Sequence, residues 1–275
     1  MFEKLISAIR TESRVTDTNN NPLSIFSLQG RTAFVTGAGS GLGREIALSF
    51  VAAGATVIAA DIDQNAVIHT VETARESGWR IFGASIDVSD VRSVEESVGQ
   101  AVSEVESIDV LVNAAGIGGW GPSTTYAPEL WERVIGVNLT GTFNCCQVVG
   151  DHMVASGFGS IVNVASTLGL AGFPGTIGYV ASKGGVVQLT RALAVEWAAA
   201  GVRVNALAPS TFETPLVETN RARRPEVYEK LLSLTPLGRL GRIGEIVGPA
   251  LFLASEASSM VTGHVLAVDG GYLAQ

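Results

Sequence analysis

Short runs rich in β-branched residues alternate with longer stretches rich in Ala, Glu and Leu, and no other feature limits the fold of this chain as much. The predicted strands are Thr32–Val35, Thr56–Ala60, Arg80–Ser85, Asp109–Val112, Ser160–Val164, Val202–Ala206 and His264–Val268. The helices expected between them include Leu42–Ala53, Ser93–Val105, Glu129–Met153, Tyr179–Ala200 and Gly244–Ser255. Strands that alternate with helices pair in parallel through right-handed crossovers. The sequence therefore predicts an α/β fold, a single doubly wound parallel sheet of about seven strands with helices on both faces.

Size, composition and charge fit one filled domain. The chain has 275 residues, of which 47% are hydrophobic and 16% are charged. Its formal net charge of −8 argues against sequence-independent nucleic-acid binding, which needs a basic face. No apolar run reaches ~18 residues, and residues 1–6 lack the order of a signal peptide. Neither a membrane nor a nucleic acid is expected as a partner.

The only cysteines, Cys145 and Cys146, are adjacent, and a disulfide between them would close a strained ring. We expect two buried, small, apolar side chains in a reducing compartment. The protein is therefore predicted to be cytoplasmic.

Residues 1–29 are predicted to form an extension that precedes a catalytic domain of residues 30–275. Apolar side chains at helical spacing within residues 2–10 predict a short amphipathic helix. Residues 16–22 have the composition of a linker. The extension either docks on the domain or a neighbouring subunit, or forms a partly ordered tail.

A glycine-rich turn follows the first predicted strand and precedes a helix. It fits the pattern G-x-x-x-G-x-G at Gly37, Gly41 and Gly43, and it does not fit G-x-G-x-x-G. Glycines at the positive end of a helix let backbone amides approach a pyrophosphate. We therefore expect this turn, with Ser40 and Leu42, to hold a dinucleotide; glycines that only serve a tight turn are the alternative.

Asp61 closes the second predicted strand, about twenty positions after Gly41. A carboxylate there can accept hydrogen bonds from both hydroxyls of the adenosine ribose, and it would repel a 2′-phosphate. Arg44 is close in sequence, but Ser40 adds no positive charge, so NAD is favoured over NADP. Further cofactor contacts are predicted at the strand ends: Ile62, Asp87, Val88, Asn113, Ala114, Ala115 and Gly116.

Tyr179 and Lys183 are four residues apart on a predicted helix, so they share one face. A phenol has a pKa near ~10 and is a poor base at neutral pH, but a neighbouring ammonium favours the phenolate and lowers that pKa. Ser166 follows the fifth predicted strand, where its hydroxyl can stabilise developing alkoxide character on a substrate oxygen. Thr167 competes for that role.

Taken in order, these motifs resemble those of the classical short-chain dehydrogenases/reductases over roughly residues 30–272. The matching positions are Thr36–Gly43, Asn113–Gly116, Asn138, Ser166, Tyr179 and Lys183. The resemblance implies a Rossmann-type fold in which Tyr179 is the general acid/base and Ser166 orients the substrate oxygen. It further implies that Lys183 tunes the tyrosine and holds the nicotinamide ribose. Asn138, a poor helix former, would hold a water in a proton relay towards Lys183.

Beyond the sixth predicted strand this family usually has P-G-x-x-x-T, whereas this chain has Ser210 in place of the glycine. The replacement puts the turn in question, because glycine tolerates backbone torsions that serine does not. The resemblance still implies cofactor contacts at Pro209, Phe212 and Thr214, with Thr214 on the nicotinamide carboxamide.

Residues 210–235 lie where the family has a mobile lid over the substrate. The three arginines of this segment either grip an anionic group such as a carboxylate or form a solvated charged face. Trp120 and Phe173 flank the predicted site and are expected to shape its wall. The predicted substrate contacts are Ser166, Phe173, Tyr179, Arg221, Arg223 and Arg224.

The leading prediction is an NAD-dependent oxidoreductase that transfers hydride between the cofactor and a secondary alcohol of a sugar, sugar acid or polyol. Within the family it is most similar to gluconate- and deoxygluconate-dehydrogenase-type members. The alternative is a 3-oxoacyl-(acyl-carrier-protein) reductase, which shares the catalytic residues but normally prefers NADPH and needs a basic patch for its acidic carrier. A third alternative is a non-catalytic dinucleotide sensor or scaffold on the same fold.

The C-terminal segment from Pro236 to Tyr272 resembles the assembly region of the family, which implies a homotetramer or a homodimer. The three histidines are scattered in the sequence and lack metal-ligand spacing, so no metal is predicted.

Overall fold

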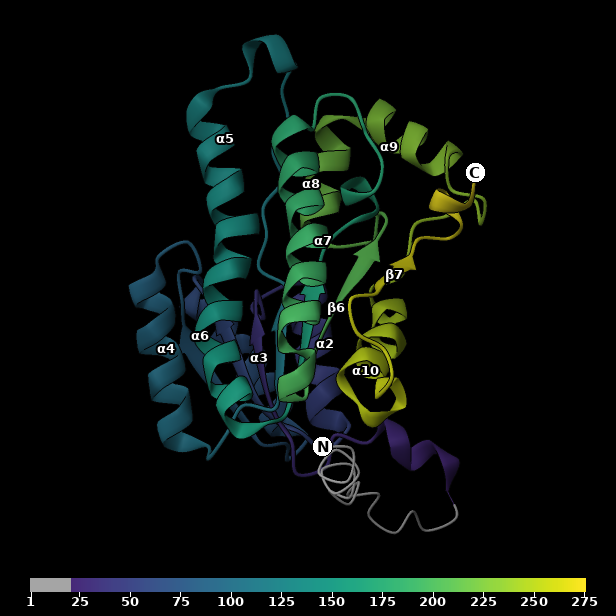
Figure 1. The fold of residues 1–275 in the computed structure, drawn as a ribbon. Coiled ribbons are helices and arrows are strands. Elements are labelled where there is room, and N and C mark those ends of the chain that lie inside the picture. Colours follow the sequence, from purple (N-terminus) through teal and green to yellow (C-terminus); the bar gives the residue numbers. More distant parts are fainter. Residues whose placement is uncertain (1–20) are drawn as a thin grey trace, which may run out of the picture.

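Seven parallel strands organise residues 21–275, the part of the chain that the computed structural model describes (Figure 1). They are β1 (Thr32–Thr36), β2 (Thr56–Asp61), β3 (Ile81–Ser85), β4 (Val110–Asn113), β5 (Gly159–Val164), β6 (Val202–Pro209) and β7 (Val265–Val268). Their order across the sheet is β3-β2-β1-β4-β5-β6-β7. The strand order reverses between β1 and β4, and ligands of such sheets bind beyond the carboxyl ends of the strands at this point. The predicted doubly wound α/β fold is confirmed.

Helices cover both faces of the sheet (Figure 1). They are α2 (Gly41–Ala52), α3 (Gln64–Glu76), α4 (Val91–Glu104), α5 (Pro128–Ile135), α6 (Gly141–Ser156), α7 (Ile177–Trp197), α8 (Pro215–Arg223), α9 (Pro225–Ser233) and α10 (Val247–Ala254). Shorter turns are η1 (Pro22–Phe26), η2 (Ser123–Thr125), η3 (Gly136–Thr140), η4 (Thr167–Gly169), η5 (Ala198–Ala200), η6 (Ile243–Ile246), η7 (Glu256–Ser258) and η8 (Tyr272–Ala274). Helices α2, α3 and α10 pack on one face, and α4, α6 and α7 pack on the other.

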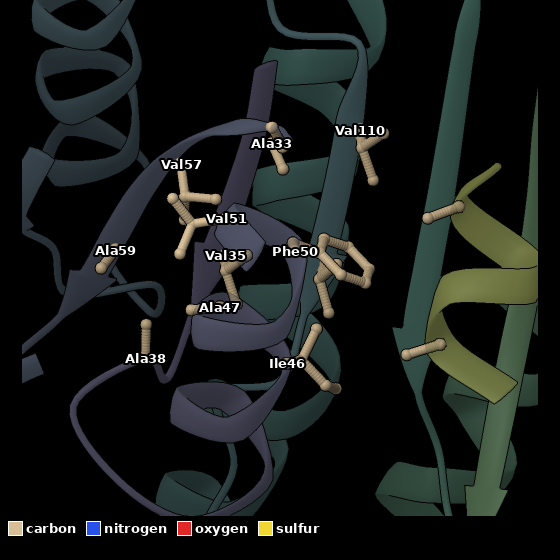
Figure 2. Packing of buried hydrophobic residues seen from close by; sticks show 14 of the residues in the cluster. Ala33, Val35, Ala38, Ile46, Ala47, Phe50, Val51, Val57, Ala59 and Val110 are labelled. Carbon is tan, nitrogen blue, oxygen red and sulfur yellow. The ribbon is translucent and has the colours of Figure 1, made fainter. Parts of the chain in front are cut away.

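The core consists mainly of two buried layers, one on each side of the sheet. Successive residues of a strand point to opposite faces, so Ala33 and Val35 of β1 enter one layer and Phe34 enters the other. Figure 2 shows the first layer, in which Phe50 of α2 packs beside Ile46 and the strands. Because the central strands are buried on both faces, they read as continuous apolar runs in the sequence.

The helix predicted over Glu129–Met153 is continuous in the structure, but it contains one local widening. The chain forms α5 and α6 there, joined by the π turn η3. This turn holds Asn138, whose side chain bonds the backbone of Ile117 outside the helix. Apolar periodicity does not report such a local widening, because the flanking helices keep nearly the same apolar face.

The first buried residue in the described part of the chain is Leu28, just inside the segment predicted as an extension. Leu28 is buried in the first core layer, and its backbone N–H donates to the carbonyl of Ala53 at 3.0 Å. The amphipathic helix predicted for residues 2–10 lies outside the described residues, and the division at residue 29 stays a prediction. Within residues 21–275, no helix has both the length and the apolar character that a membrane crossing requires.

Truncation of Phe50 tests the first core layer. Phe50 has no exposed surface, so Phe50→Ala is expected to lower the free energy of unfolding by about 3–5 kcal/mol, measured by urea denaturation. Ile68→Ala on α3 is the control: Ile68 is 53% exposed and should cost less than about 1 kcal/mol. Equal losses in the two variants would contradict the placement of Phe50 in the core.

Candidate active site

The glycine-rich turn lies at the carboxyl end of β1, where two backbone segments approach closely. Gly37 has φ +67°, and a Cβ there would lie 2.7–2.8 Å from the backbone of Ala114 and Ala115. A Cβ at Gly43 would run into the carbonyl of Gly37. Only glycine fits at these two positions, so the turn brings the start of α2 directly over the end of β4.

The amino end of α2 forms the last part of this turn. Ser40 precedes the helix in an extended conformation, and its side chain makes no capping hydrogen bond. The first amides of a helix lack partners within the helix, and the helix dipole favours an anion beside them. The cradle, in which Gly37 and Gly43 have no room for a Cβ and Gly41 has φ +55°, therefore fits the pyrophosphate of a dinucleotide.

Asp61 lies at the carboxyl end of β2 and faces this turn. One carboxylate oxygen accepts the N–H of Gly39 at 3.0 Å, and the other accepts the N–H of Asp63 at 3.1 Å. Each carboxylate oxygen keeps acceptor capacity for a further donor, such as a ribose hydroxyl. The guanidinium of Arg44 is bonded instead to the Thr73 hydroxyl on α3, at 3.1 Å.

The other predicted strand-end contacts divide into surface and buried groups. Ile62 is exposed next to Asp61. The Asp87 carboxylate accepts the backbone N–H and hydroxyl of Ser89 at 2.9 and 2.6 Å, which fixes the turn after β3. Val88 is buried, and its carbonyl accepts the Asn144 side chain at 2.9 Å. The hydrogen bonds of Asp87 and Val88 thus fix the backbone that follows β3.

Asn113 is buried under the site. Its amide nitrogen donates to Asn163 at 2.9 Å and to the sulfur of Cys146 at 3.3 Å. Asn163 in turn donates to Thr190 on α7 at 2.9 Å. Asn113 was predicted to contact the cofactor, and this stays a prediction; its amide nitrogen ties β4 to β5 and α6. The backbone of Ala114 and Ala115, which follows Asn113, lies against Gly37 of the glycine-rich turn.

The Thr36 hydroxyl orders that backbone. It accepts the N–H groups of Ala114 and Ala115 at 3.2 and 3.3 Å. The two cysteines below are buried, as predicted. Burial raises the pKa of the Cys146 thiol to about 12, so it stays protonated at neutral pH.

Asn138 is fully buried in the π turn. Its amide oxygen accepts the N–H of Ile117 at 2.8 Å, and its amide nitrogen donates to the Ile117 carbonyl and the Ser182 hydroxyl, both at 3.0 Å. Ser182, which we did not single out from the sequence, lies next to Lys183 on α7 and donates to the carbonyl of Tyr179 at 2.8 Å. Asn138 therefore locks α7 to the segment that follows β4.

Tyr179, Lys183 and Ser166 meet where α7 crosses the carboxyl end of β5. The Lys183 ammonium donates to the Val164 carbonyl at 2.7 Å and lies 5.9 Å from the centroid of the Tyr179 ring. Ser166 hydrogen-bonds the Tyr179 phenol. A Cβ at Gly169 would touch the Lys183 carbonyl, at 2.7 Å. This close packing sets the Ser166 segment against α7 and brings the three predicted catalytic side chains together.

The pKa of Tyr179 shifts in the direction opposite to the one expected from the neighbouring Lys183. Burial raises it above the ordinary value, and the hydrogen bond with Ser166 opposes this only in part. Burial also lowers the pKa of Lys183 to about 8. We expected the ammonium to lower the pKa of Tyr179, but desolvation of the phenol dominates. Both groups are thereby shifted towards their neutral forms.

The segment after β6 accommodates Ser210 without strain. Among residues 21–275 only glycines have positive φ, so Ser210 takes an ordinary conformation, and its N–H donates to the Val268 carbonyl at 3.2 Å. Phe212 was predicted to contact the cofactor, and this stays a prediction; its ring is buried against Gly241 in the core. Thr214 caps α8 by accepting the N–H of Val217 at 3.3 Å, and its side chain lies above Gly41.

The predicted lid contains α8 and α9, which lie beyond the carboxyl ends of the strands (Figure 1). Of its arginines, Arg221 and Arg223 are exposed, whereas Arg224 is half-buried against Trp120. The ring centroids of Trp120 and Phe173 are 6.4 Å apart, so the two predicted wall residues do meet. Tyr228 on α9 is a neighbour that we missed; its proximity contributes to the raised pKa of Tyr179. Its only sequence signal is helical spacing from Arg224.

Comparison with known proteins gives one family and a set of near relatives. The family model described as "Enoyl-(Acyl carrier protein) reductase" matches residues 37–273. Galactitol 2-dehydrogenase (L-tagatose-forming) of Cereibacter sphaeroides is 44% identical over 252 residues, 90% of this chain and 97% of that protein. A 3-oxoacyl-(acyl-carrier-protein) reductase of Thermotoga maritima is 42% identical over 245 residues, 89% of this chain and 98% of that protein.

A solved structure of similar shape is a gluconate 5-dehydrogenase from Burkholderia cenocepacia in complex with NADP and tartrate. It has a TM-score of 0.89 and 36% sequence identity, and the match covers 93% of this chain and 100% of that one. Within residues 21–275, no cluster of three or more His, Cys, Asp or Glu side chains is arranged to hold a metal ion.

Replacing Gly37 tests the cradle. Gly37→Ala is expected to weaken NADH binding at least about tenfold, because its Cβ would press on the Ala114–Ala115 backbone and open the turn. Gly30→Ala is the matched control: it has φ +74° but nothing within 4 Å of a Cβ, so it carries the backbone strain without the clash. Fluorescence titration with NADH measures both, and equal affinities would contradict the proposed cradle.

Proposed function

Because the chain belongs to the classical short-chain dehydrogenase/reductase family, we propose that it transfers hydride between NAD and a secondary alcohol of a sugar, sugar acid or polyol. It is an oxidoreductase that acts on alcohol groups of the sugar or polyol type with a nicotinamide dinucleotide. The observation that carries the proposal is the meeting of Ser166, Tyr179 and Lys183 beside the glycine cradle.

The mechanism follows from the positions of these side chains. The bound dinucleotide supplies the hydride acceptor for oxidation and the donor for reduction. Tyr179 takes the proton of the substrate hydroxyl at its phenolic oxygen and returns it in the reverse direction. Ser166 binds the same substrate oxygen and stabilises its developing negative charge. Lys183, with a pKa of about 8, is mostly charged at neutral pH, and its charge offsets part of the cost that burial imposes on the Tyr179 phenolate.

Asn138 has a more limited role than the resemblance implies for its side chain. Its amide is fully engaged by Ile117 and Ser182. A relay water at this position would have to be held by the main-chain carbonyl, which accepts the Thr142 hydroxyl at 2.8 Å and keeps a second lone pair. The side chain therefore positions α7, and proton transfer would use the backbone.

Asp61 favours NAD over NADP. Its carboxylate lies at the end of β2 beside the cradle, and Arg44 is bonded to Thr73. A 2′-phosphate would meet the Asp61 charge, whereas a ribose hydroxyl would find an acceptor. The Burkholderia gluconate 5-dehydrogenase structure contains NADP, so family likeness alone does not choose the cofactor.

Asp61→Ala should reduce the preference for NAD over NADP, as the ratio of kcat/KM values, by about tenfold or more. The variant loses a charged acceptor for the ribose and a repulsion towards the 2′-phosphate. Asp63→Ala is the matched control, because it removes a carboxylate that caps α3 two residues away. An unchanged cofactor ratio in Asp61→Ala, or an equal change in Asp63→Ala, would contradict the assignment.

A 3-oxoacyl-(acyl-carrier-protein) reductase is the second candidate, supported by the Thermotoga relative of 42% identity. An acidic carrier would need a basic surface near the site, and the exposed Arg221 and Arg223 on α8 are the basic side chains of the lid helix. The net charge of −8 and Asp61, which disfavours NADPH, count against this activity.

A paired screen separates the two activities. The purified protein is tested with NAD and NADP on sugars, sugar acids and polyols, and with NADH and NADPH on a 3-oxoacyl thioester. We expect NAD-linked oxidation of a sugar-type alcohol, followed by absorbance at the reduced nicotinamide band. NADPH-linked thioester reduction without alcohol oxidation would replace the proposal by the second candidate.

Tyr179→Phe is the control for chemistry in the same screen. It removes only the phenolic oxygen, so turnover should fall by at least about a hundredfold while NADH affinity changes little. Turnover near that of the wild type would remove Tyr179 from its proposed role. NADH binding by wild-type protein without turnover on any substrate would support a dinucleotide sensor.

A further inference from the structure

Arg224 differs from the other lid arginines because of the residue that follows it. Pro225 opens α9 and disfavours a helical conformation at the preceding position. Arg224 accordingly leaves the helix, with φ −146° and ψ 64°, and ends α8. Its backbone N–H is fixed by the Asn220 carbonyl at 3.0 Å. The side chain therefore starts from a defined joint between two helices.

The Arg224 guanidinium is held on an aromatic surface. Its central carbon lies 4.6 Å from the centroid of the Trp120 ring, within the range of a cation–π contact. Trp120 is itself wedged in place: Gly175 has φ +77°, and a Cβ there would lie 2.6 Å from the indole. The backbone N–H of Gly121 also donates to the Gly175 carbonyl at 2.9 Å. Arg224 thus stacks on a platform joined to the segment that precedes Tyr179.

This arginine has unused hydrogen-bonding capacity. In the described part of the chain its guanidinium forms no ion pair, and no hydrogen bond from it is found. Arg221 and Arg223 are exposed to solvent, whereas Arg224 is half-buried, where water screens charge less. A stacked guanidinium keeps its N–H groups in one plane and can present them to a carboxylate in pairs.

The platform adjoins the predicted reaction centre. Phe173, 6.4 Å from Trp120, lies between Ser166 and Tyr179 in the sequence. Tyr228, four residues after Arg224 on the next helix, is near both places: burial raises its pKa, with Asn220 and Arg224 opposing this in part, and its own proximity adds to the raised pKa of Tyr179. Because Phe173 and Gly175, which pack against Trp120, belong to the segment that leads into Tyr179, we infer that a ligand at the Tyr179 phenol can extend towards Arg224.

We propose that Arg224, stacked on Trp120, binds the carboxylate of the substrate, so that the enzyme acts on hydroxy acids of the sugar-acid type in preference to neutral polyols. The inference rests on the proposed function for the reaction and adds the substrate class. Arg224 is a specificity residue, and Trp120 and Pro225 are positioning residues that hold it. If the contact between Arg224 and Trp120 only held the lid in place, replacing Arg224 would change the affinity for acidic and for neutral ligands equally.

The test compares two ligands that differ at one group. D-Gluconate and D-glucitol have the same hydroxyl stereochemistry, but gluconate has a carboxylate where glucitol has a hydroxymethyl group. Their binding to protein saturated with NADH is measured by isothermal titration calorimetry. Arg224→Gln should weaken gluconate binding by about 10- to 100-fold and change glucitol binding less than about twofold. Arg224→Lys, which keeps the charge but not the planar fork, should lie between wild type and Arg224→Gln.

Arg221→Gln and Arg223→Gln are matched controls and should change neither ligand's affinity by more than about twofold. The inference would be overturned if wild-type protein bound gluconate no better than glucitol, if Arg224→Gln lost both ligands equally, or if Arg221→Gln or Arg223→Gln matched its effect. This binding experiment does not depend on turnover. If NAD-linked oxidation were absent but gluconate binding depended on Arg224, the proposed function would fail and the anion site would stand.

Discussion

The close approach of the β1 and β4 carboxyl ends is the contact on which the site depends. Gly37 lies against the Ala114–Ala115 backbone with no room for a Cβ, and the Thr36 hydroxyl bonds both alanine amides. This contact sets the start of α2 over the crevice side of β4 and orients its free amides. Because Gly37 has a positive φ, any other residue would strain the backbone there, and its Cβ would also clash with the Ala114–Ala115 backbone. The dinucleotide cradle is thus a property of backbone packing.

A buried polar network transmits that placement to the catalytic helix. Asn113, Asn163 and Thr190 bond in series from β4 through β5 to α7. Asn138 adds a second link from the backbone at Ile117 to Ser182. A buried amide without partners costs free energy, so these groups favour one register of α7 against the sheet. Tyr179 and Lys183 take their positions beside Ser166 from that register.

Local patterns predicted the strands, the glycine turn and the Tyr179–Lys183 pair, because each follows from spacing along one element. Contacts between distant segments were not predictable in this way. The π turn at Asn138 depends on Ile117, and the burial of Phe212 depends on Gly241. Among the three lid arginines, only Arg224 precedes a proline in the sequence, and its contact with Trp120, about a hundred residues earlier, is seen only in the structure. The raised pKa of Tyr179 reflects burial, which spacing does not report.

The opposing pKa shifts give the position of Arg224 a chemical consequence. Burial makes both the Tyr179 phenolate and the Lys183 ammonium less favourable. Any further negative charge near the phenol would make the phenolate still less favourable. A carboxylate left unpaired beside Tyr179 would raise the phenol pKa further and oppose proton removal. A carboxylate paired with Arg224 on the Trp120 platform would have most of that field cancelled. An arginine in this place therefore both selects an acidic substrate and preserves the basicity that its oxidation requires.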